Sequence, residues 1–123
     1  MFDYFNKNNF SFNYNLGSKT WFGTGGKCFC FITVNSKRTI SIILKYFKRV
    51  FPVFIVGAGS NLIVRDGGIN GIVIKLGKSF SQIKLYKKES ILEIGGSTKD
   101  FEISKFCLKN NITGFEFLSG EPG

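Results

Sequence analysis

Histidine is absent from this chain of 123 residues, and cysteine is limited to Cys28, Cys30 and Cys107. The lack of histidine removes the commonest general base and the commonest metal ligand. A structural zinc site needs four ligands, and the sequence offers no plausible set of four. We therefore predict no metal site, and we expect the three cysteines to be small buried side chains.

Long apolar runs are also missing. The longest apolar segment falls short of the roughly 20 residues that a membrane-spanning helix needs. Residues 1–10 lack the basic start and the apolar run of a secretory signal peptide, and unpaired thiols suit a reducing compartment. The sequence thus predicts a cytoplasmic protein without a membrane partner.

Acidic residues are few, with 8 Asp and Glu against 17 Lys and Arg, so the formal net charge is +9. A basic balance favours anionic partners such as nucleic acids or phosphorylated ligands. Short, dispersed clusters of basic residues are typical of solvated faces. The aromatic content of 16% could stack bases, but most rings fall on predicted core faces and no RNA-binding signature is present. A basic nucleic-acid-binding module is therefore the less favoured alternative.

Hydrophobic periodicity predicts a mixture of helices and strands. Ile40, Ile43, Leu44 and Phe47 have helical spacing, so we expect a helix over 36–50. Residue 35 or 36 can cap this helix, and residue 97 or 98 can cap a later helix whose buried face would hold residues 103, 106 and 107. This helix lies between two β-rich segments and would complete a βαβ unit. The other predicted elements are strands over 28–34, 53–56, 62–64, 71–76, 80–86 and 90–94 and a helix over 98–109.

Composition divides the chain into three parts. Residues 1–15 are polar and aromatic without a clear period, and we expect a poorly ordered lead-in there. Residues 16–76 hold the βαβ unit and form a first lobe. Residues 77–123 begin at Gly77, a plausible boundary between lobes, and form a second part.

The most informative segment is residues 52–76, PVFIVGAGSNLIVRDGGINGIVIKL. A buried-strand pattern ends at Val56 and leads into a glycine-rich bend, where bare backbone N–H groups can converge on a phosphate or diphosphate. The Rossmann fingerprint fails because Leu62 stands where a third glycine is needed and β-rich residues follow it. A Walker loop fails because no Gly-Lys-Ser/Thr follows. On spacing alone, an ordinary glycine-rich turn between strands stays an open alternative.

Four ordered motifs carry a family resemblance. Residues 57–76 resemble the flavin-binding segment of UDP-N-acetylenolpyruvoylglucosamine reductases, enzymes of peptidoglycan precursor synthesis. Residues 20–26 (TWFGTGG) are similar to the opening TWFxxGG element of that family, and residues 95–97 (GGS) are similar to its second glycine-rich turn. Residues 113–120 (TGFEFLSG) are similar to its TGLEFLSGIPG loop. The resemblance covers nearly all of residues 16–123.

The resemblance implies a two-lobed α+β FAD-binding domain of the PCMH type, whose glycine-rich loops grip the FAD diphosphate between the lobes. Residues 16–76 would be its first lobe, and residues 77–123 would be an incomplete second lobe. In the family, NADPH reduces FAD, the flavin passes hydride to an enolpyruvyl UDP-sugar, and a side chain protonates the resulting carbanion. The cofactor-binding residues that the resemblance implies are Gly57, Ala58, Gly59, Ser60 and Asn61 in the first loop, Gly95, Gly96 and Ser97 in the second, and Ser119 and Gly120 in the third.

The resemblance reaches only the opening portion of the family. The Ser, Arg and Glu that the family uses for proton transfer belong to its later portion, so no residue here receives a catalytic role. We expect this chain not to use NADPH by itself unless a separate chain supplies the missing half. Glu121 stands where the family has an apolar residue, and a carboxylate beside a diphosphate would repel it. A truncated remnant without function is a further interpretation, because a missing lobe would leave apolar surface exposed.

Overall fold

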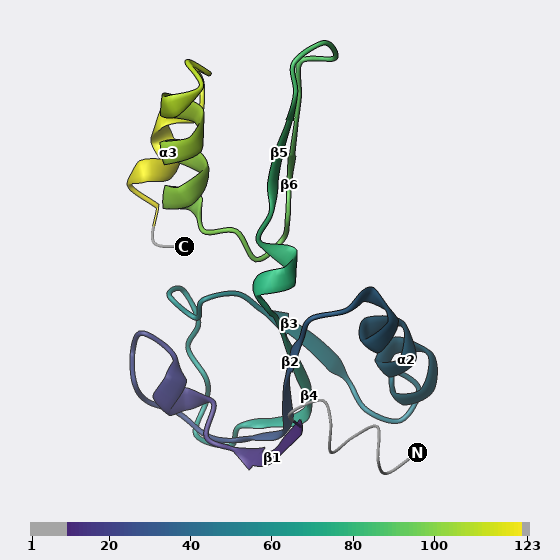
Figure 1. Cartoon of the computed structure of the whole chain (residues 1–123). Helices are drawn as coiled ribbons and strands as arrows, with labels where there is room; N and C mark the ends of the chain where they lie inside the picture. Colours follow the sequence, from purple (N-terminus) through teal and green to yellow (C-terminus); the bar gives the residue numbers. More distant parts are fainter. Residues whose placement is uncertain (1–9, 122–123) are drawn as a thin grey trace. The chain divides into compact units, whose positions relative to one another are not determined.

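The computed structural model describes residues 10–121. Helices and strands are both present, so the α+β prediction is confirmed (Figure 1). The chain divides into two compact units, Met1–Gly77 and Lys78–Gly123. The expected boundary at Gly77 falls at this division, and the assignment of the units to two lobes of one flavin-binding domain stays a prediction.

The first unit contains a sheet of four strands. In the order in which they lie side by side, the strands are β1 (Phe10–Tyr14), β2 (Cys28–Val34), β4 (Ile69–Leu76) and β3 (Val53–Val56). β4 is parallel to both of its neighbours, whereas β1 is antiparallel to β2. β2 and β3 are thus parallel strands joined through a helix, and the later strand β4 is inserted between them. This arrangement confirms the predicted βαβ unit.

The predicted lead-in over residues 1–15 is wrong for the residues that form β1. Residues 10–14 pair with β2, where Phe10 lies opposite Ile32 and Tyr14 opposite Cys28. The Tyr14 ring also stacks on the Phe31 ring, with centroids 4.4 Å apart. Residues 10–14 (FSFNY) alternate apolar and polar side chains, which is the local signal of a strand that the prediction of an aperiodic lead-in overlooked. Residues 1–9 of the lead-in lie outside the described residues.

Helix α2 (Lys37–Phe47) connects β2 to β3. Its cap is Ser36, whose Oγ accepts a hydrogen bond from the backbone N–H of Thr39 (3.2 Å), as the sequence predicted. Thr39 and Ile43 are the buried residues of the helix, and Leu44 is 40% exposed. The buried face is therefore rotated away from the predicted one, which included Leu44.

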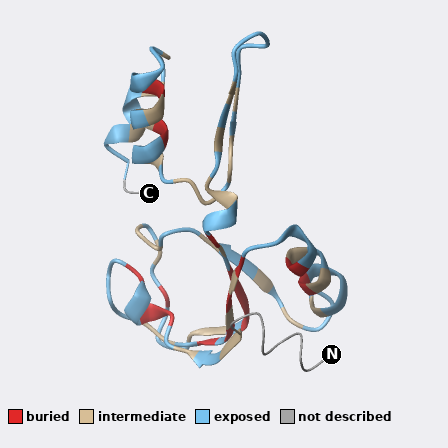
Figure 2. Ribbon diagram, viewed as in Figure 1, coloured by how far each residue is buried: buried red, intermediate tan, exposed pale blue. Residues whose placement is uncertain are grey.

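Buried residues gather on β2, on β4 and on one side of α2 (Figure 2). Ile32, Ile43 and Ile74 are among the largest fully buried side chains. A second buried cluster joins the loops to the sheet and consists of Leu16, Cys28, Val64 and Val73. Val64 belongs to the predicted strand 62–64, but these residues form no strand. This prediction is wrong because Val64 is buried by packing in the cluster and its segment pairs with no strand of the sheet.

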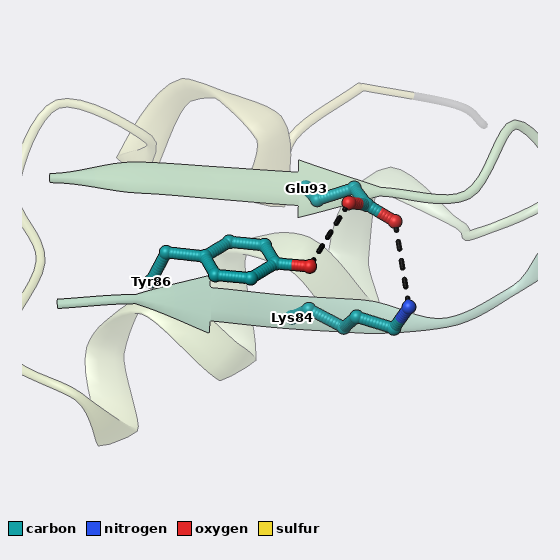
Figure 3. A network of polar contacts seen from close by, with 3 residues as sticks. All are labelled: Lys84, Tyr86 and Glu93. Atoms are coloured by element: carbon teal, nitrogen blue, oxygen red, sulfur yellow. Dashed lines mark hydrogen bonds and ion pairs between the residues drawn. The ribbon is translucent and has the colours of Figure 1, made fainter. Parts of the chain in front are cut away.

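The second unit begins with the short 3-10 helix η2 (Lys78–Phe80), and then two antiparallel strands, β5 (Ile83–Tyr86) and β6 (Ile91–Ile94), form a hairpin. On its polar face, Glu93 accepts a hydrogen bond from the Tyr86 hydroxyl (3.2 Å) and forms an ion pair with Lys84 (3.6 Å), as Figure 3 shows. Both side chains of the ion pair are about half exposed, at 50% and 52%, so its contribution to stability is at most about 1 kcal/mol.

Helix α3 (Asp100–Lys109) follows the hairpin, and the 3-10 helix η3 (Glu116–Ser119) packs against it. The sequence predicted capping by residue 97 or 98, and this is wrong because Lys99 holds the cap position and no side chain caps the helix. Ile103 and Cys107 are buried as predicted, whereas Phe106, which was also predicted to be buried, is only partly so.

Two negative findings apply to residues 10–121. Within this range, no helix has both the length and the apolar character that crossing a membrane requires. No group of three or more cysteine, aspartate or glutamate side chains in the same range is placed to hold a metal ion.

Candidate functional site

The loop Gly57–Asn61 follows the carboxyl end of β3 and leaves the sheet as a series of bends. Within the described part of the chain, the backbone N–H groups of Gly57, Ala58, Gly59 and Asn61 donate no hydrogen bond. These four donors are therefore available to an acceptor from outside the loop. The sequence predicted this property, and the neighbouring strands do not use these amides.

The two glycines of this loop have different roles. A Cβ atom added to Gly57 would meet no atom within 4 Å, so the backbone there faces open space. Gly59 has a φ of +83°, and a Cβ atom there would lie 3.5 Å from the carbonyl oxygen of Lys19. Left-handed backbone beside extended or right-handed residues turns successive N–H groups toward one side and forms an anion-binding concavity. The left-handed Gly59 is therefore a backbone feature that such concavities use.

A second segment holds the loop in place. The backbone N–H of Trp21 donates to the carbonyl of Gly59 (3.0 Å). Trp21 follows Thr20, whose Oγ1 donates to the carbonyl of Gly17 (2.9 Å). The predicted site residues did not include Thr20 and Trp21. Both residues belong to the TWFGTGG motif, which resembles a family element, but the sequence does not show which segment this motif contacts.

Glycines at the end of that motif allow two backbone segments to cross closely. A Cβ atom on Gly25 would lie 1.9 Å from the carbonyl oxygen of Val64, and one on Gly26 would lie 2.3 Å from that of Asp66. Gly26 donates its N–H to the carbonyl of Arg65 (2.9 Å). The two glycines thus bring residues 17–26 against residues 64–68. This contact positions Trp21 beside the Gly57–Asn61 loop, which we call the flavin-loop candidate.

The second predicted loop, Gly95–Ser97, lies in the other compact unit, between β6 and α3. Gly95 donates its N–H to the carbonyl of Gln82 (2.8 Å), and Ser97 donates to that of Phe80 (3.1 Å). A Cβ atom on Gly95 would lie 2.0 Å from the carbonyl oxygen of Phe80, so glycine is required there for packing. The Gly96 N–H remains as the one amide of this loop that makes no hydrogen bond within the described residues.

The third predicted loop surrounds η3 in the same unit. The Ser119 hydroxyl donates to the carbonyl of Glu116 (2.7 Å), and the Gly120 N–H donates to that of Phe117 (3.2 Å). Both predicted donors are thus used within their own turn. Glu121 is exposed, so its carboxylate carries no burial cost in this chain.

The three cysteines are free and buried, as the sequence predicted. Burial, and to a smaller extent the neighbouring Cys28, raise the pKa of the Cys30 thiol to about 11. Burial also raises the pKa of Cys28. Because the reactive form of cysteine is the thiolate, these thiols are protonated and unreactive at neutral pH.

Comparison with known proteins adds an independent result. The FAD binding domain family matches residues 29–123. A UDP-N-acetylenolpyruvoylglucosamine reductase of Orientia tsutsugamushi (strain Boryong) is 40% identical over 113 residues, which are 90% of this chain and 37% of that protein. Proteins of the same name from Rickettsia canadensis (strain McKiel) and Rickettsia massiliae (strain Mtu5) are each 42% identical over 117 residues, 95% of this chain and 39% of theirs. The chain therefore spans less than two fifths of the length of these relatives.

Proposed function

Because the chain belongs to the FAD binding domain family, we propose that its loop Gly57–Asn61 binds the diphosphate of FAD. The observation that carries this proposal is the set of backbone N–H groups without a partner at Gly57, Ala58, Gly59 and Asn61. A diphosphate offers several acceptor oxygens and two negative charges, and bonds from backbone N–H groups to charged acceptors are roughly twice as strong as neutral ones.

Side chains of the same loop add further donors. Ser60 and Asn61 carry a hydroxyl and a carboxamide beside these amides, and both groups can donate to phosphate oxygens. The open space beside the Cα atom of Gly57 lets a phosphate group approach the backbone. The net charge of +9 also favours an anionic ligand over a neutral one.

The second and third loops extend the proposal more weakly. Gly96 offers one unused amide, whereas Gly95, Ser97, Ser119 and Gly120 already donate within their own turns. We propose that these four residues maintain the conformation of the two loops and that the Gly96 N–H contacts the diphosphate directly.

The wider function follows from the relatives. Bound FAD supplies hydride transfer, and the relatives are named as reductases of a UDP-sugar. We propose that this chain provides the flavin-binding part of such a reductase in peptidoglycan precursor synthesis, that NADPH is the reductant, and that a separate chain supplies the catalytic part. The three free cysteines fit a reducing compartment, which supports a cytoplasmic location.

A titration with FAD, followed by flavin fluorescence, tests the proposal on the full chain. Gly57→Leu places a side chain in the space through which phosphate reaches the amides, so we expect at least about a tenfold loss of affinity. Gly67→Leu is the matched control, because a Cβ atom there also meets no atom within 4 Å and neither glycine has a positive φ. We expect the control variant to bind FAD like the unmodified chain.

Two results would contradict the proposal. One is equal FAD affinity in both variants, provided that circular dichroism shows both to be folded. The other is the absence of flavin binding by the unmodified chain together with a salt-dependent shift of single-stranded RNA, which would favour the nucleic-acid alternative.

A further inference from the structure

A second candidate site lies at the opposite end of the first unit's sheet. A hollow of about 660 Å³ is lined at the starts of β2 and β4 by Cys28, Phe29, Ile69 and Asn70. The Gly57–Asn61 loop follows the end of β3, where Val56 pairs with Lys75 near the end of the parallel strand β4. The hollow shares no residue with that loop, although Gly25, Gly26 and Asp66 of the crossing that holds the loop in place also line it.

Carboxamide groups surround this hollow. Asn13 and Asn70 make no side-chain hydrogen bond within the described residues, and Asn15 uses only its Oδ1, which accepts from the N–H of Ser18 (3.3 Å). Each free carboxamide carries both donors and an acceptor. A ligand that satisfies all three must itself donate and accept, as hydroxyl groups do.

Opposite charges also line the hollow without neutralising each other. Lys27 and Asp66 both line it. Among residues 10–121 the only ion pair is Lys84–Glu93, so Lys27 and Asp66 are not paired with each other. An anionic ligand would face the carboxylate of Asp66, and a cationic ligand would face the ammonium of Lys27. The lining has no net charge and therefore favours a neutral ligand.

Two aromatic rings give the hollow an apolar side. Phe12 is 64% exposed and meets the Phe29 ring edge to face, with centroids 5.8 Å apart. Phe29 is also stacked on Phe51 at 4.8 Å, so one of its faces is already covered. The rings therefore offer no parallel pair of faces to enclose a flat nucleobase, but they offer apolar contact to the C–H groups of a puckered ring.

From these groups we propose that the hollow binds a neutral sugar. The sugar ring places its C–H face against Phe12, and its hydroxyl groups exchange hydrogen bonds with the carboxamides of Asn13, Asn15 and Asn70. Lys27 donates to a hydroxyl oxygen, and Asp66 accepts from a hydroxyl group. The volume lies within the range of small-molecule sites, and the exposure of the hollow predicts weak binding.

Saturation-transfer-difference NMR of the full chain with glucose and N-acetylglucosamine, each at about 10 mM, tests the proposal. We expect transfer to ring protons, with a dissociation constant in the millimolar range. Gly67→Leu fills the hollow without backbone strain, because Gly67 lines it and a Cβ atom there meets no atom. We expect this variant to weaken binding at least about fivefold, and Asn70→Ala to do the same through loss of a carboxamide.

The control is Ser41→Leu, which adds the same side chain at an exposed position of α2 outside the hollow and leaves sugar binding unchanged. The proposal fails if the unmodified chain shows no transfer to either sugar, or if neither hollow variant weakens it. Transfer to adenosine but not to the sugars would also overturn it. FAD titration of the same samples keeps this outcome separate from that of the flavin proposal.

Discussion

Cys30 shows how one side chain acquires its properties from its place in the fold. Cys30 is 2% exposed and lies in β2, where it pairs with Phe12 on one side and with Ile72 on the other. Removal of water from around the group disfavours the charged thiolate, so the pKa rises to about 11. The sequence predicted a buried cysteine from residue type alone, but the size of the effect depends on neighbours that only the folded chain provides.

This raised pKa predicts a pH dependence of stability. The folded-state pKa of Cys30 lies above the ordinary value of 9.0, so its contribution is fully present below about pH 9 and is lost as the pH rises through about 11. Over that range we expect the free energy of unfolding to fall by roughly 2 kcal/mol relative to Cys30→Ala. Urea unfolding of both proteins at several pH values measures this difference.

Comparison of the two proteins removes the titration of lysine and tyrosine, because both groups are present in each. Measurements between about pH 8 and about pH 11.5 cover both the ordinary and the raised pKa of the thiol. If the difference in unfolding free energy between the two proteins stays constant over this range, the Cys30 thiol ionises as easily in the folded chain as in the unfolded one, and the prediction is wrong.

At the scale of elements, the close crossing of two loops decides the shape of the flavin-loop candidate. Gly17 donates its N–H to the carbonyl of Gly26 (3.0 Å), and Gly26 donates to that of Arg65 (2.9 Å). The first bond closes residues 17–26 on themselves, and the second places them against residues 64–68. The bond from the Trp21 N–H to the Gly59 carbonyl then joins this crossing to the Gly57–Asn61 loop. The TWFGTGG motif was visible in the sequence, but the segment that it packs against was not.

Two alanine substitutions separate the effect of this crossing from that of backbone conformation. Gly25 and Gly23 both have positive φ angles, +112° and +65°, so alanine is strained at both positions. Only at Gly25 would the new Cβ atom also overlap another group, the carbonyl of Val64. We expect Gly25→Ala to cost about 3 kcal/mol or more of unfolding free energy and Gly23→Ala about 1 kcal/mol, both measured by urea unfolding. Equal losses would mean that the loops do not cross as closely as described.

At the scale of the whole molecule, the chain carries the flavin-loop candidate but spans only 37–39% of the length of its relatives. Large apolar side chains are exposed in both units, among them Trp21 at 72% and Leu108 at 78%. Exposed apolar surface of this kind is typical of faces that contact another domain or chain. This supports the proposal that a separate chain supplies the catalytic part.

The same reasoning predicts the behaviour of the isolated chain in an enzyme assay. The resemblance assigns proton transfer to a Ser, an Arg and a Glu for which this sequence has no matching positions. We therefore expect FAD-loaded chain to show no oxidation of NADPH that depends on the enolpyruvyl UDP-sugar, as followed by absorbance. A full-length relative such as the Orientia protein serves as the positive control, and substrate-dependent turnover by this chain alone would contradict the prediction.

The sequence by itself determined the elements whose signals are local. Apolar residues at helical spacing predicted α2, and Asn35 or Ser36 was predicted as its cap, of which the structure uses Ser36. The glycines of residues 57–61 predicted amides without partners. Each of these depends on residues within a few positions along the chain, where helical spacing, capping geometry and backbone freedom act directly.

Only the tertiary structure decided the features that depend on distant residues. It placed residues 10–14 in the sheet beside β2, and it removed the predicted strand at 62–64 by packing Val64 into the core. It also used the amides of Gly95 and Ser97 within the second unit, which left the first loop as the principal anion-binding candidate. Pairing, packing and the occupation of a donor are properties of two partners, and a single segment of sequence contains only one of them.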